Sequence, residues 1–252
     1  MSDAEILARF DSETRADPPD EPGLVRTWAD GVLRGVGAYN FIGWWRLAPH
    51  EVDAAVAAQT AFFRERGEEV EWKVFSHDGP ANLEATLEGA GWVADGAETF
   101  VVFDLEAGDI EAVSSPGIEV RRAIDRSGVE DYVAANTAAF GVRENHWLET
   151  LPPRLGDPSL EVYVAYADGA PVASGRLEMI PGSAFAGLYG GGTAPEHRGR
   201  GVYRALVAAR ATEARARGFR YLFVDARETS RPILERLGFR SLATVRGWML
   251  TP

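Results

Sequence analysis

The sequence has no cysteine among its 252 residues, which excludes disulfides, thiolate metal sites and a cysteine nucleophile. Its four histidines are scattered, and no two of them are four residues apart, so we expect no metal site. No apolar run approaches the roughly 20 residues that span a bilayer, and the acidic start lacks the basic and apolar parts of a signal peptide. We therefore expect a cytoplasmic protein that does not enter a membrane.

The chain is also short of positive charge, with a formal net charge of -12. Nucleic-acid binding needs a basic face, so we expect no nucleic-acid partner. Thr193 to Arg220 is the exception, with seven arginines against two glutamates. A basic patch on an acidic body fits an anionic co-substrate used on a cationic substrate. Alternatively, Arg210, Arg215 and Arg217 are only the solvated face of one helix.

A hydrophobic content of 46% is typical of a globular chain, and the length suits one large or two modest domains. The residues before Gly23 form a polar extension, in which Ile6, Leu7 and Phe10 predict a short helix followed by a loop. The elements that we predict next are short strands within Gly23–Trp45, a helix over Pro49–Arg66 that stops at Gly67, a strand over Val70–Phe75, a helix over Asn82–Glu88 and a strand over Glu98–Leu105.

Gly108–Pro116 reads as a linker because it is rich in small residues and proline. The pattern beyond it alternates between strand and helix periods. The predicted elements are strands over 118–123, 160–167, 171–179, 185–192, 220–226 and 239–250 (the last a strand or a hairpin) and helices over 129–140, 144–151, 199–217 and 231–237.

The stretch from Leu188 to Leu206 organises the rest. An apolar strand stops at three glycines, and Arg198-Gly-Arg-Gly201 then opens a long helix. The first N–H groups of a helix are unpaired and carry the positive end of its dipole, so this start predicts an anion site. Glycines let a phosphate lie directly against the backbone, and Arg198, Arg200 and Arg204 add donors. Neither a Walker loop nor a dinucleotide fingerprint fits the spacing.

The loop resembles the acyl-CoA pyrophosphate loop of the GCN5-related N-acetyltransferase (GNAT) family, Gln/Arg-x-x-Gly-x-Gly/Ala. Here it reads Glu196-His-Arg-Gly199-Arg-Gly201, and Glu196 departs from the pattern. Ser230-Arg-Pro-Ile-Leu-Glu-Arg-Leu-Gly238-Phe239 looks like the closing segment of the family. The likeness implies an α/β (α+β) acyl-CoA N-acyltransferase fold over residues 118–252, with a mixed, mostly antiparallel central sheet flanked by helices.

Part of the same order of elements recurs, less clearly, in the first half of the chain. A strand over Val70–Phe75, a helix that ends near Gly91 and a further strand mirror the segment from Arg220 onward, but no Gly-x-Gly precedes the helix from Pro49. The chain thus resembles a tandem GNAT protein whose N-terminal half is degenerate and smaller. The domain organisation that we predict is an extension over 1–22, a degenerate lobe over 23–107, a linker over 108–117 and an acetyltransferase domain over 118–252.

The resemblance implies that acetyl-CoA is the co-substrate and that no metal takes part. The residues that it assigns to acetyl-CoA are Gly190, Gly191, Gly192, Thr193, Arg198, Gly199, Arg200, Gly201, Val202 and Tyr203, with Tyr189 beside the thioester. In the family a tyrosine acts as the general acid, and its position is occupied by Leu234 here. The resemblance therefore leaves Tyr203, Ser230 or a water to protonate the leaving thiolate, or the thiolate leaves unassisted. Glu178 is the first candidate for the base; Glu144, His146 and Glu228 are alternatives.

We therefore expect an N-acetyltransferase that moves an acetyl group directly to the amine of a small molecule, and a homodimer is compatible with the sequence. The alternatives are an acyl-CoA sensor or structural protein without turnover, a protein N-acetyltransferase, and transfer to a hydroxyl or of a longer acyl chain. Trp44 and Trp45 belong either to the core or to the acceptor pocket.

Overall fold

The computed structural model describes residues 1–21, 23–110 and 117–252, and the predicted linker residues 111–116 lie outside them. The chain divides into two compact units, each described separately below. The first unit is Met1–Val101, Asp225–Arg231 and Ser241–Pro252, and the second is Val102–Val224 and Pro232–Arg240. None of the helices in the described ranges has the length and apolar character needed to cross a membrane.

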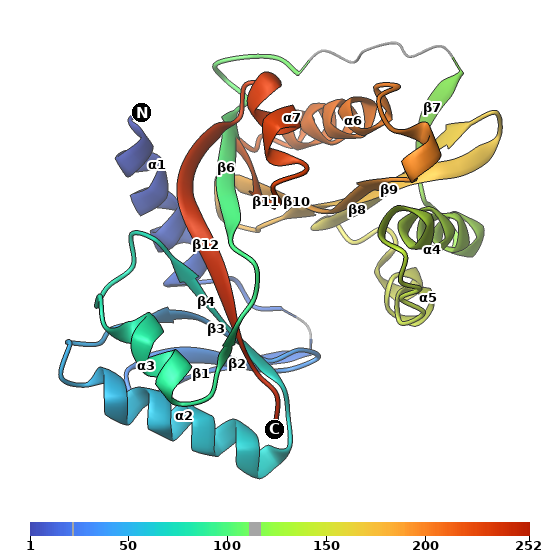
Figure 1. Ribbon diagram of the computed structural model, residues 1–252. Helices are drawn as coiled ribbons and strands as arrows, with labels where there is room; N and C mark the ends of the chain where they lie inside the picture. The colour runs from blue at the N-terminus through green and yellow to red at the C-terminus, as the bar shows by residue number, and fades with distance from the viewer. Residues whose placement is uncertain (22, 111–116) are drawn as a thin grey trace. The chain divides into compact units, whose positions relative to one another are not determined.

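The first unit is built on a mixed sheet in the order β1-β2-β3-β4-β12 (Figure 1). Its strands are β1 (Leu24–Ala29), β2 (Val32–Gly37), β3 (Phe41–Trp45), β4 (Val70–Phe75) and all but the first residue of β12 (Arg240–Leu250). β5 (Val93–Ala94) pairs with β12, and β6 (Glu98–Asp104) begins in this unit. β3 and β4 are parallel, because the helix α2 (Val52–Arg66) connects them.

Apolar side chains at helical spacing explain how α2 packs on this sheet. Val52, Val56 and Phe63 are fully buried in one core cluster with Trp72 of β4. Gly67 ends the helix in the left-handed conformation (φ 64°), which a glycine adopts without a steric penalty. The other helical elements of the unit are α1 (Asp3–Phe10), the π-helical turn η1 (Asp11–Arg15) and α3 (Leu83–Gly89).

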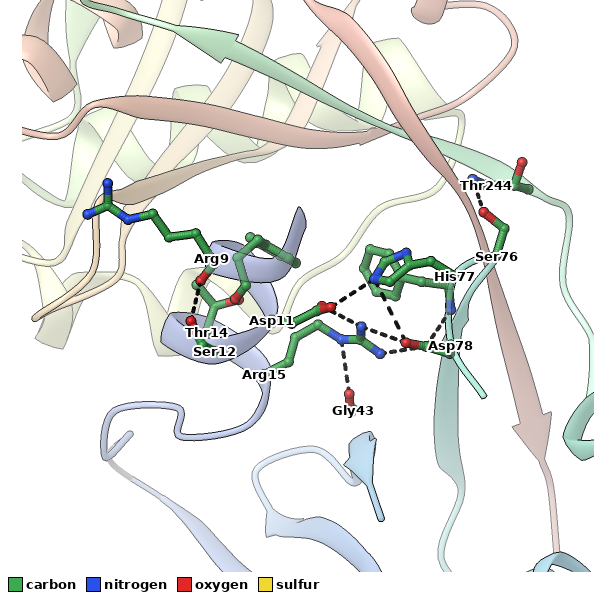
Figure 2. A network of polar contacts seen from close by, with 12 residues as sticks. Arg9, Asp11, Ser12, Thr14, Arg15, Gly43, Ser76, His77, Asp78 and Thr244 are labelled. Carbon is green, nitrogen blue, oxygen red and sulfur yellow. Dashed lines mark hydrogen bonds and ion pairs between the residues drawn. The ribbon is translucent and has the colours of Figure 1, made fainter. Parts of the chain in front are cut away.

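A buried arginine fixes η1 to the rest of the first unit (Figure 2). The Arg15 side chain is 7% exposed and binds Asp78 through both terminal nitrogens, at 2.9 and 2.6 Å. The same guanidinium donates to Asp11 at 2.7 Å and to the carbonyl of Gly43 at 3.1 Å, and it lies 4.1 Å from the ring centroid of Phe75. Sequence analysis predicted a loop after the first helix; this ion pair instead holds residues 11–15 in a helical turn.

A second charged cluster of the first unit is a source of pH dependence. Lys73 on β4 is ion-paired with Asp225, and the carboxyl groups of Glu71 and Glu98 also interact electrostatically with its ammonium group. Burial raises the pKa of Glu71, and Asp225 adds to the rise while Lys73 opposes it. Burial likewise raises the pKa of Glu98. A carboxyl whose pKa is raised by folding favours the folded state when protonated and loses that contribution as the pH rises.

We expect the Glu71→Gln variant to lose less stability than the wild type between acid and neutral pH. The glutamine cannot ionise, whereas each unit of raised pKa costs the wild type about 1.4 kcal/mol once Glu71 is ionised. Thermal unfolding followed across that pH range measures the difference. The matched change Glu65→Gln, on the exposed face of α2, should leave the profile unaltered, and parallel profiles for Glu71→Gln and the wild type would contradict the assignment.

The second unit is a mostly antiparallel sheet in the order β7-β8-β9-β10-β11 with helices on both faces (Figure 1). Its strands are β7 (Ile118–Arg122), β8 (Leu160–Ala167), β9 (Ala170–Met179), β10 (Phe185–Thr193) and most of β11 (Tyr221–Ala226). Its helical elements are α4 (Arg126–Phe140), α5 (Trp147–Thr150), η2 (Pro152–Arg154), η3 (Pro195–His197), α6 (Val202–Ala216) and most of α7 (Arg231–Arg236). The helices α4 and α6 cover opposite faces of β8–β10.

The predicted helices and strands are present in the described residues, but several of their bounds differ. The helix predicted from Pro49 begins at Val52, and the helix predicted from Val129 begins at Arg126. The helix predicted over 144–151 is a single turn over Trp147–Thr150, and the 3-10 turn η2 follows it from Pro152. The helix predicted from Gly199 begins three residues later, at Val202. The last element is one long strand rather than a hairpin, and it pairs along β4 from Val245↔Phe75 to Leu250↔Val70.

Candidate functional site

Two left-handed glycines shape the loop before α6. Gly199 has a φ of 73° and Gly201, which is the N-cap of α6, a φ of 80°. Other L residues rarely adopt this conformation, so the loop depends on glycine at both positions. A Cβ at Gly199 would meet no atom within 4 Å, so the backbone faces open space there. The two turns also explain why α6 starts at Val202, whose side chain is buried while its N–H lies at the helix start.

The loop presents a row of unpaired donors. In the part of the chain that the structure describes, the N–H groups of residues 199–204 make no hydrogen bond, and the first helical one runs from Ala205 to Gly201 at 3.0 Å. Gly199 and Arg200 are exposed to solvent. A helix start with free N–H groups, left-handed glycines and exposed cations is suited to bind a phosphate.

The three arginines of the loop have different tasks. Arg198 donates to the carbonyls of Thr193 at 3.1 Å and Ala139 at 3.3 Å, so it anchors the loop to β10 and α4. Arg200 contacts Nδ1 of His197 at 3.0 Å and is exposed. Arg204 has a buried Nε without a partner among the described residues. Arg200 and Arg204 therefore retain donors for a ligand.

The strand β10 has a bulge just before this loop. Tyr189 pairs with Arg176 and Gly192 with Ser174, so Gly190 and Gly191 face the single residue Gly175 across the ladder. On the other side, the parallel pairing with β11 runs only from Phe185↔Tyr221 to Gly187↔Phe223. Beyond Gly187 the two strands separate, and the edge of β10 is left open to a ligand over the described residues.

Glycine is required at the bulge because large side chains press on it from both faces. A Cβ at Gly190 would lie 2.8 Å from the hydroxyl of Tyr132 on α4, and one at Gly192 would lie 2.7 Å from the ring of Phe140. On the α6 face, a Cβ at Gly191 would lie 3.2 Å from the ring of Tyr203 and 3.4 Å from the Nη2 atom of Arg210. Successive residues face opposite sides of a strand, so helices on both faces contact the bulge.

The α4 face of the bulge carries a hydrogen-bonded chain. Arg176 donates to the Tyr132 hydroxyl at 2.6 Å and to Glu178 at 3.0 Å, and its guanidinium lies 4.2 Å from the ring centroid of Trp147. Burial raises the pKa of Tyr132, and Arg176 opposes the rise. Glu178, the first candidate for the base, is thus ion-paired, although its side chain remains 36% exposed.

The other catalytic candidates lie in different surroundings. The ring of Tyr189 packs edge-on against Phe223, with 6.1 Å between centroids. Tyr203 is half-buried; burial raises its pKa, and Arg210 opposes the rise. Ser230 belongs to the first unit, where its hydroxyl donates to the carbonyl of Arg227 at 3.2 Å. Leu234, at the position of the family's acidic tyrosine, is fully buried.

Each of the three alternative bases contacts a neighbouring side chain. Glu144 accepts from the indole N–H of Trp147 at 3.2 Å, and the ring of His146 packs 4.2 Å from that of Trp147. Glu228 is 85% exposed and pairs with Arg231 at 3.7 Å. Among the residues described, no group of three or more His, Asp and Glu side chains is arranged to hold a metal ion.

Residues 128–239 match the model of the acetyltransferase (GNAT) family. This part of the chain is a GNAT acetyltransferase domain. A comparison with the sequences of curated proteins finds no match. The expected fold, a mixed and mostly antiparallel sheet flanked by helices, is confirmed by solved structures of the same family.

Three solved structures cover 98% of the chain. A GCN5-related N-acetyltransferase from Kribbella flavida has a TM-score of 0.72 at 16% identity over 94% of its own chain. A second one, from Sphaerobacter thermophilus, has a TM-score of 0.68 at 15% identity over 91% of its chain. A tandem GNAT protein of the clavulanic acid biosynthesis pathway has a TM-score of 0.62 at 16% identity over 93% of its chain.

A second register of the loop motif, counted from Arg198 in place of Glu196, also fits this geometry. If the motif starts at Arg198, its Gln/Arg position is filled by the residue that anchors the loop, and Gly201 takes the glycine position. The small residue that ends the motif is then replaced by Tyr203. Glu196, which departed from the pattern, is exposed in η3 and falls outside the motif.

Sequence analysis missed the residues that contact the β10 bulge from its two faces. Tyr132, Arg176 and Phe140 were read only as parts of a helix and a strand. The alternative for Arg210, as part of a solvated helix face, is wrong, because this residue is fully buried. Arg215 lies in the last turn of that helix and pairs with Asp109, whereas Arg217 is its C-cap and pairs with Glu161 and Glu213. A signal was present in the glycines at 175 and 190–192, because a strand interior seldom contains so many.

Proposed function

We propose that the protein transfers the acetyl group of acetyl-CoA directly to the amine of a small molecule. The observation that carries the proposal is the start of α6, where the N–H groups of residues 199–204 are unpaired beside Arg200 and Arg204. This arrangement fits the pyrophosphate of coenzyme A. Beside the bulge, Ser174 Oγ and Thr193 Oγ1 are buried polar atoms without a partner among the described residues.

The residues of the bulge would hold and orient the thioester. The open edge of β10 after Gly187 offers backbone N–H groups, and Gly190, Gly191 and Gly192 keep side chains out of the way. Acetyl-CoA supplies the activated acyl group when bound. A backbone N–H directed at the developing oxyanion typically contributes about 3 to 4 kcal/mol to the transition state. Thr193 and Val202 complete the path from the strand to the helix start.

The site offers fewer residues for proton transfer than for binding acetyl-CoA. The amine must be neutral when it attacks, and Glu178 is the residue that we assign to accept its proton, directly or through a water. To do so, Glu178 must give up the 3.0 Å hydrogen bond that it accepts from Arg176 and take up the proton of the amine. Tyr203 is the half-buried phenol nearest to Gly191, and we assign it to line the thioester.

A second candidate function is acyl-CoA binding without turnover. It is favoured by Leu234, which is buried in place of the tyrosine that acts as an acid in the family. The same loop would serve both functions, so only turnover separates them. Transfer to a protein N-terminus remains a further alternative with the same donor site.

We also propose that the N-terminal half is a degenerate copy of the acetyltransferase fold. In the first unit, β3 and β4 are parallel and joined by α2, as β10 and β11 are parallel and joined by α6 in the second. The segment Arg46–Glu51 before α2 contains no glycine, so it lacks the left-handed turns of Gly199 and Gly201. The domain boundaries predicted above, with a linker over 108–117, stay a proposal.

Calorimetric titration with acetyl-CoA, followed by thiol release with a panel of small amines, tests the function. We expect micromolar binding and saturable release with at least one amine, more readily with cationic amines because the protein is acidic. Binding without release from any amine or peptide would support the binding protein instead. The absence of any binding would overturn the assignment of the loop.

A further inference from the structure

Arg210 is a buried cation without a counter-ion. It lies on α6 with 0% exposure, and no carboxylate of the described residues is within 4.0 Å of it. Its Nε donates to the carbonyl of Leu206 at 3.1 Å and its Nη1 to that of Arg176 at 3.1 Å, while Nη2 has no partner among the described residues. Burial of an unpaired charge is costly, and a guanidinium does not deprotonate in proteins.

The guanidinium reaches the β-bulge through a gap left by two glycines. A Cβ at Gly175 would lie 2.8 Å from Nη1, and one at Gly191 would lie 3.4 Å from Nη2. The carbonyl of Arg176, which accepts from Nη1, belongs to the residue that pairs with Tyr189 at the edge of the bulge. Arg210 thus binds the backbone at the register shift and places its unpaired nitrogen behind Gly191.

The charged and titratable groups facing Arg210 come from four elements. They are Tyr203 on its own helix, Tyr163 on β8, Arg176 on β9 and Tyr132 on α4. None of these is an anion at neutral pH, and the second guanidinium adds repulsion. The positive charge behind Gly191 is therefore uncompensated until a negative charge arrives at the open edge of β10.

We propose that Arg210 is a positioning residue that holds the bulge and stabilises the thiolate of coenzyme A across Gly191. This inference rests on the proposed function. It gives the guanidinium of Arg210 the task of stabilising the leaving thiolate, which a tyrosine at the position of Leu234 performs in the family. In the transfer step, the amine nitrogen bonds to the acetyl carbon and the C–S bond breaks with its electron pair on sulfur. The amine proton passes to Glu178, and the thiolate takes a proton from solvent after release.

The first test measures the bound thiol and needs no turnover. Coenzyme A bound to the wild type is titrated with base, and thiolate absorbance in the ultraviolet reports its ionisation. We expect Arg210→Met to lower the thiolate fraction of bound coenzyme A about tenfold at a given pH, with Arg210→Lys in between. Gly175→Ala should act in the same direction, because its Cβ displaces the guanidinium while the charge remains.

The second test separates chemistry from binding. We expect Arg210→Met to lower kcat about tenfold or more with little change in the KM of acetyl-CoA. The matched control is Arg217→Met, at the C-cap of α6, where the arginine is ion-paired to Glu161 and Glu213. Folding of each variant is checked by thermal unfolding, and values are referred to folded protein.

Identical titration of bound coenzyme A in the wild type and in folded Arg210→Met would overturn the role of Arg210 and leave the proposed function standing. If Arg210→Met does not fold, the same reading is taken from Arg210→Lys and Gly175→Ala, and unchanged titration in both overturns the proposal. Failure of the wild type to bind coenzyme A would overturn the proposed function, and this inference with it.

Discussion

Replacing Gly201 by valine is expected to weaken the binding of acetyl-CoA at least a hundredfold. Gly201 has a φ of 80°, which a β-branched residue adopts only under strain, so the loop must rearrange. The row of N–H groups over residues 199–204 would then no longer converge, and the new side chain would occupy the space of a phosphate. A hundredfold loss corresponds to about 2.8 kcal/mol. Calorimetric titration of the folded variant measures it.

The matched control lies at the other end of the same helix. Gly218 follows α6 with a φ of 84°, and a Cβ there would meet no atom within 4 Å. Gly218→Val therefore imposes the same backbone strain without touching the loop. It should lower thermal stability to a similar degree while the affinity for acetyl-CoA stays unchanged. Equal loss of affinity in both variants would show that strain alone, rather than the loop, controls binding.

Replacing Arg15 by methionine is expected to destabilise the first unit by about 3 to 5 kcal/mol. The change leaves Asp78, which is 6% exposed, and Asp11 without the guanidinium that both contact (Figure 2). Urea unfolding followed by tryptophan fluorescence measures the loss. Six of the seven tryptophans lie in the first unit, so this signal reports mainly on that part of the chain.

Arg9 provides the comparison for Arg15. It pairs with Glu13 on the same helical segment at 2.6 Å, but its side chain is 36% exposed. Exposed ion pairs contribute little, so Arg9→Met should cost less than about 1 kcal/mol. If Arg15→Met costs no more than Arg9→Met, the buried network is not what holds η1 to the unit.

Most of the elements were predictable from the sequence because they depend on local signals. The helix over 52–66 has apolar residues at helical spacing and a glycine after its last turn, and the strand over 70–75 alternates along most of its length as expected. The glycine-rich turn before α6 was equally readable from local residues, and the binding of an anion there stays a prediction. The GNAT likeness of the second half followed from these motifs.

The rest of the site depends on contacts between residues far apart in the chain. The sequence left Arg210 either in a basic patch or on the solvated face of a helix, and only the three-dimensional arrangement shows that it is buried, with Gly175 and Gly191 making room for it. The contact between Arg176 and Tyr132 joins residues 44 positions apart. The roles of Glu178, Tyr189, Tyr203 and Ser230 stay predictions, because catalysis depends on how a substrate lies against them.

The last strand has a consequence for how the chain folds as it is made. Residues 241–250 of β12 complete the sheet of the first unit by pairing with β4, although they follow the GNAT domain in the sequence. A ribosome therefore releases residues 1–101 long before their sheet can close. Until residues 241–250 emerge, β4 has an unpaired edge of six residues, Val70–Phe75, which is open to strands of other chains. Chaperone capture during synthesis should accordingly centre on this N-terminal half.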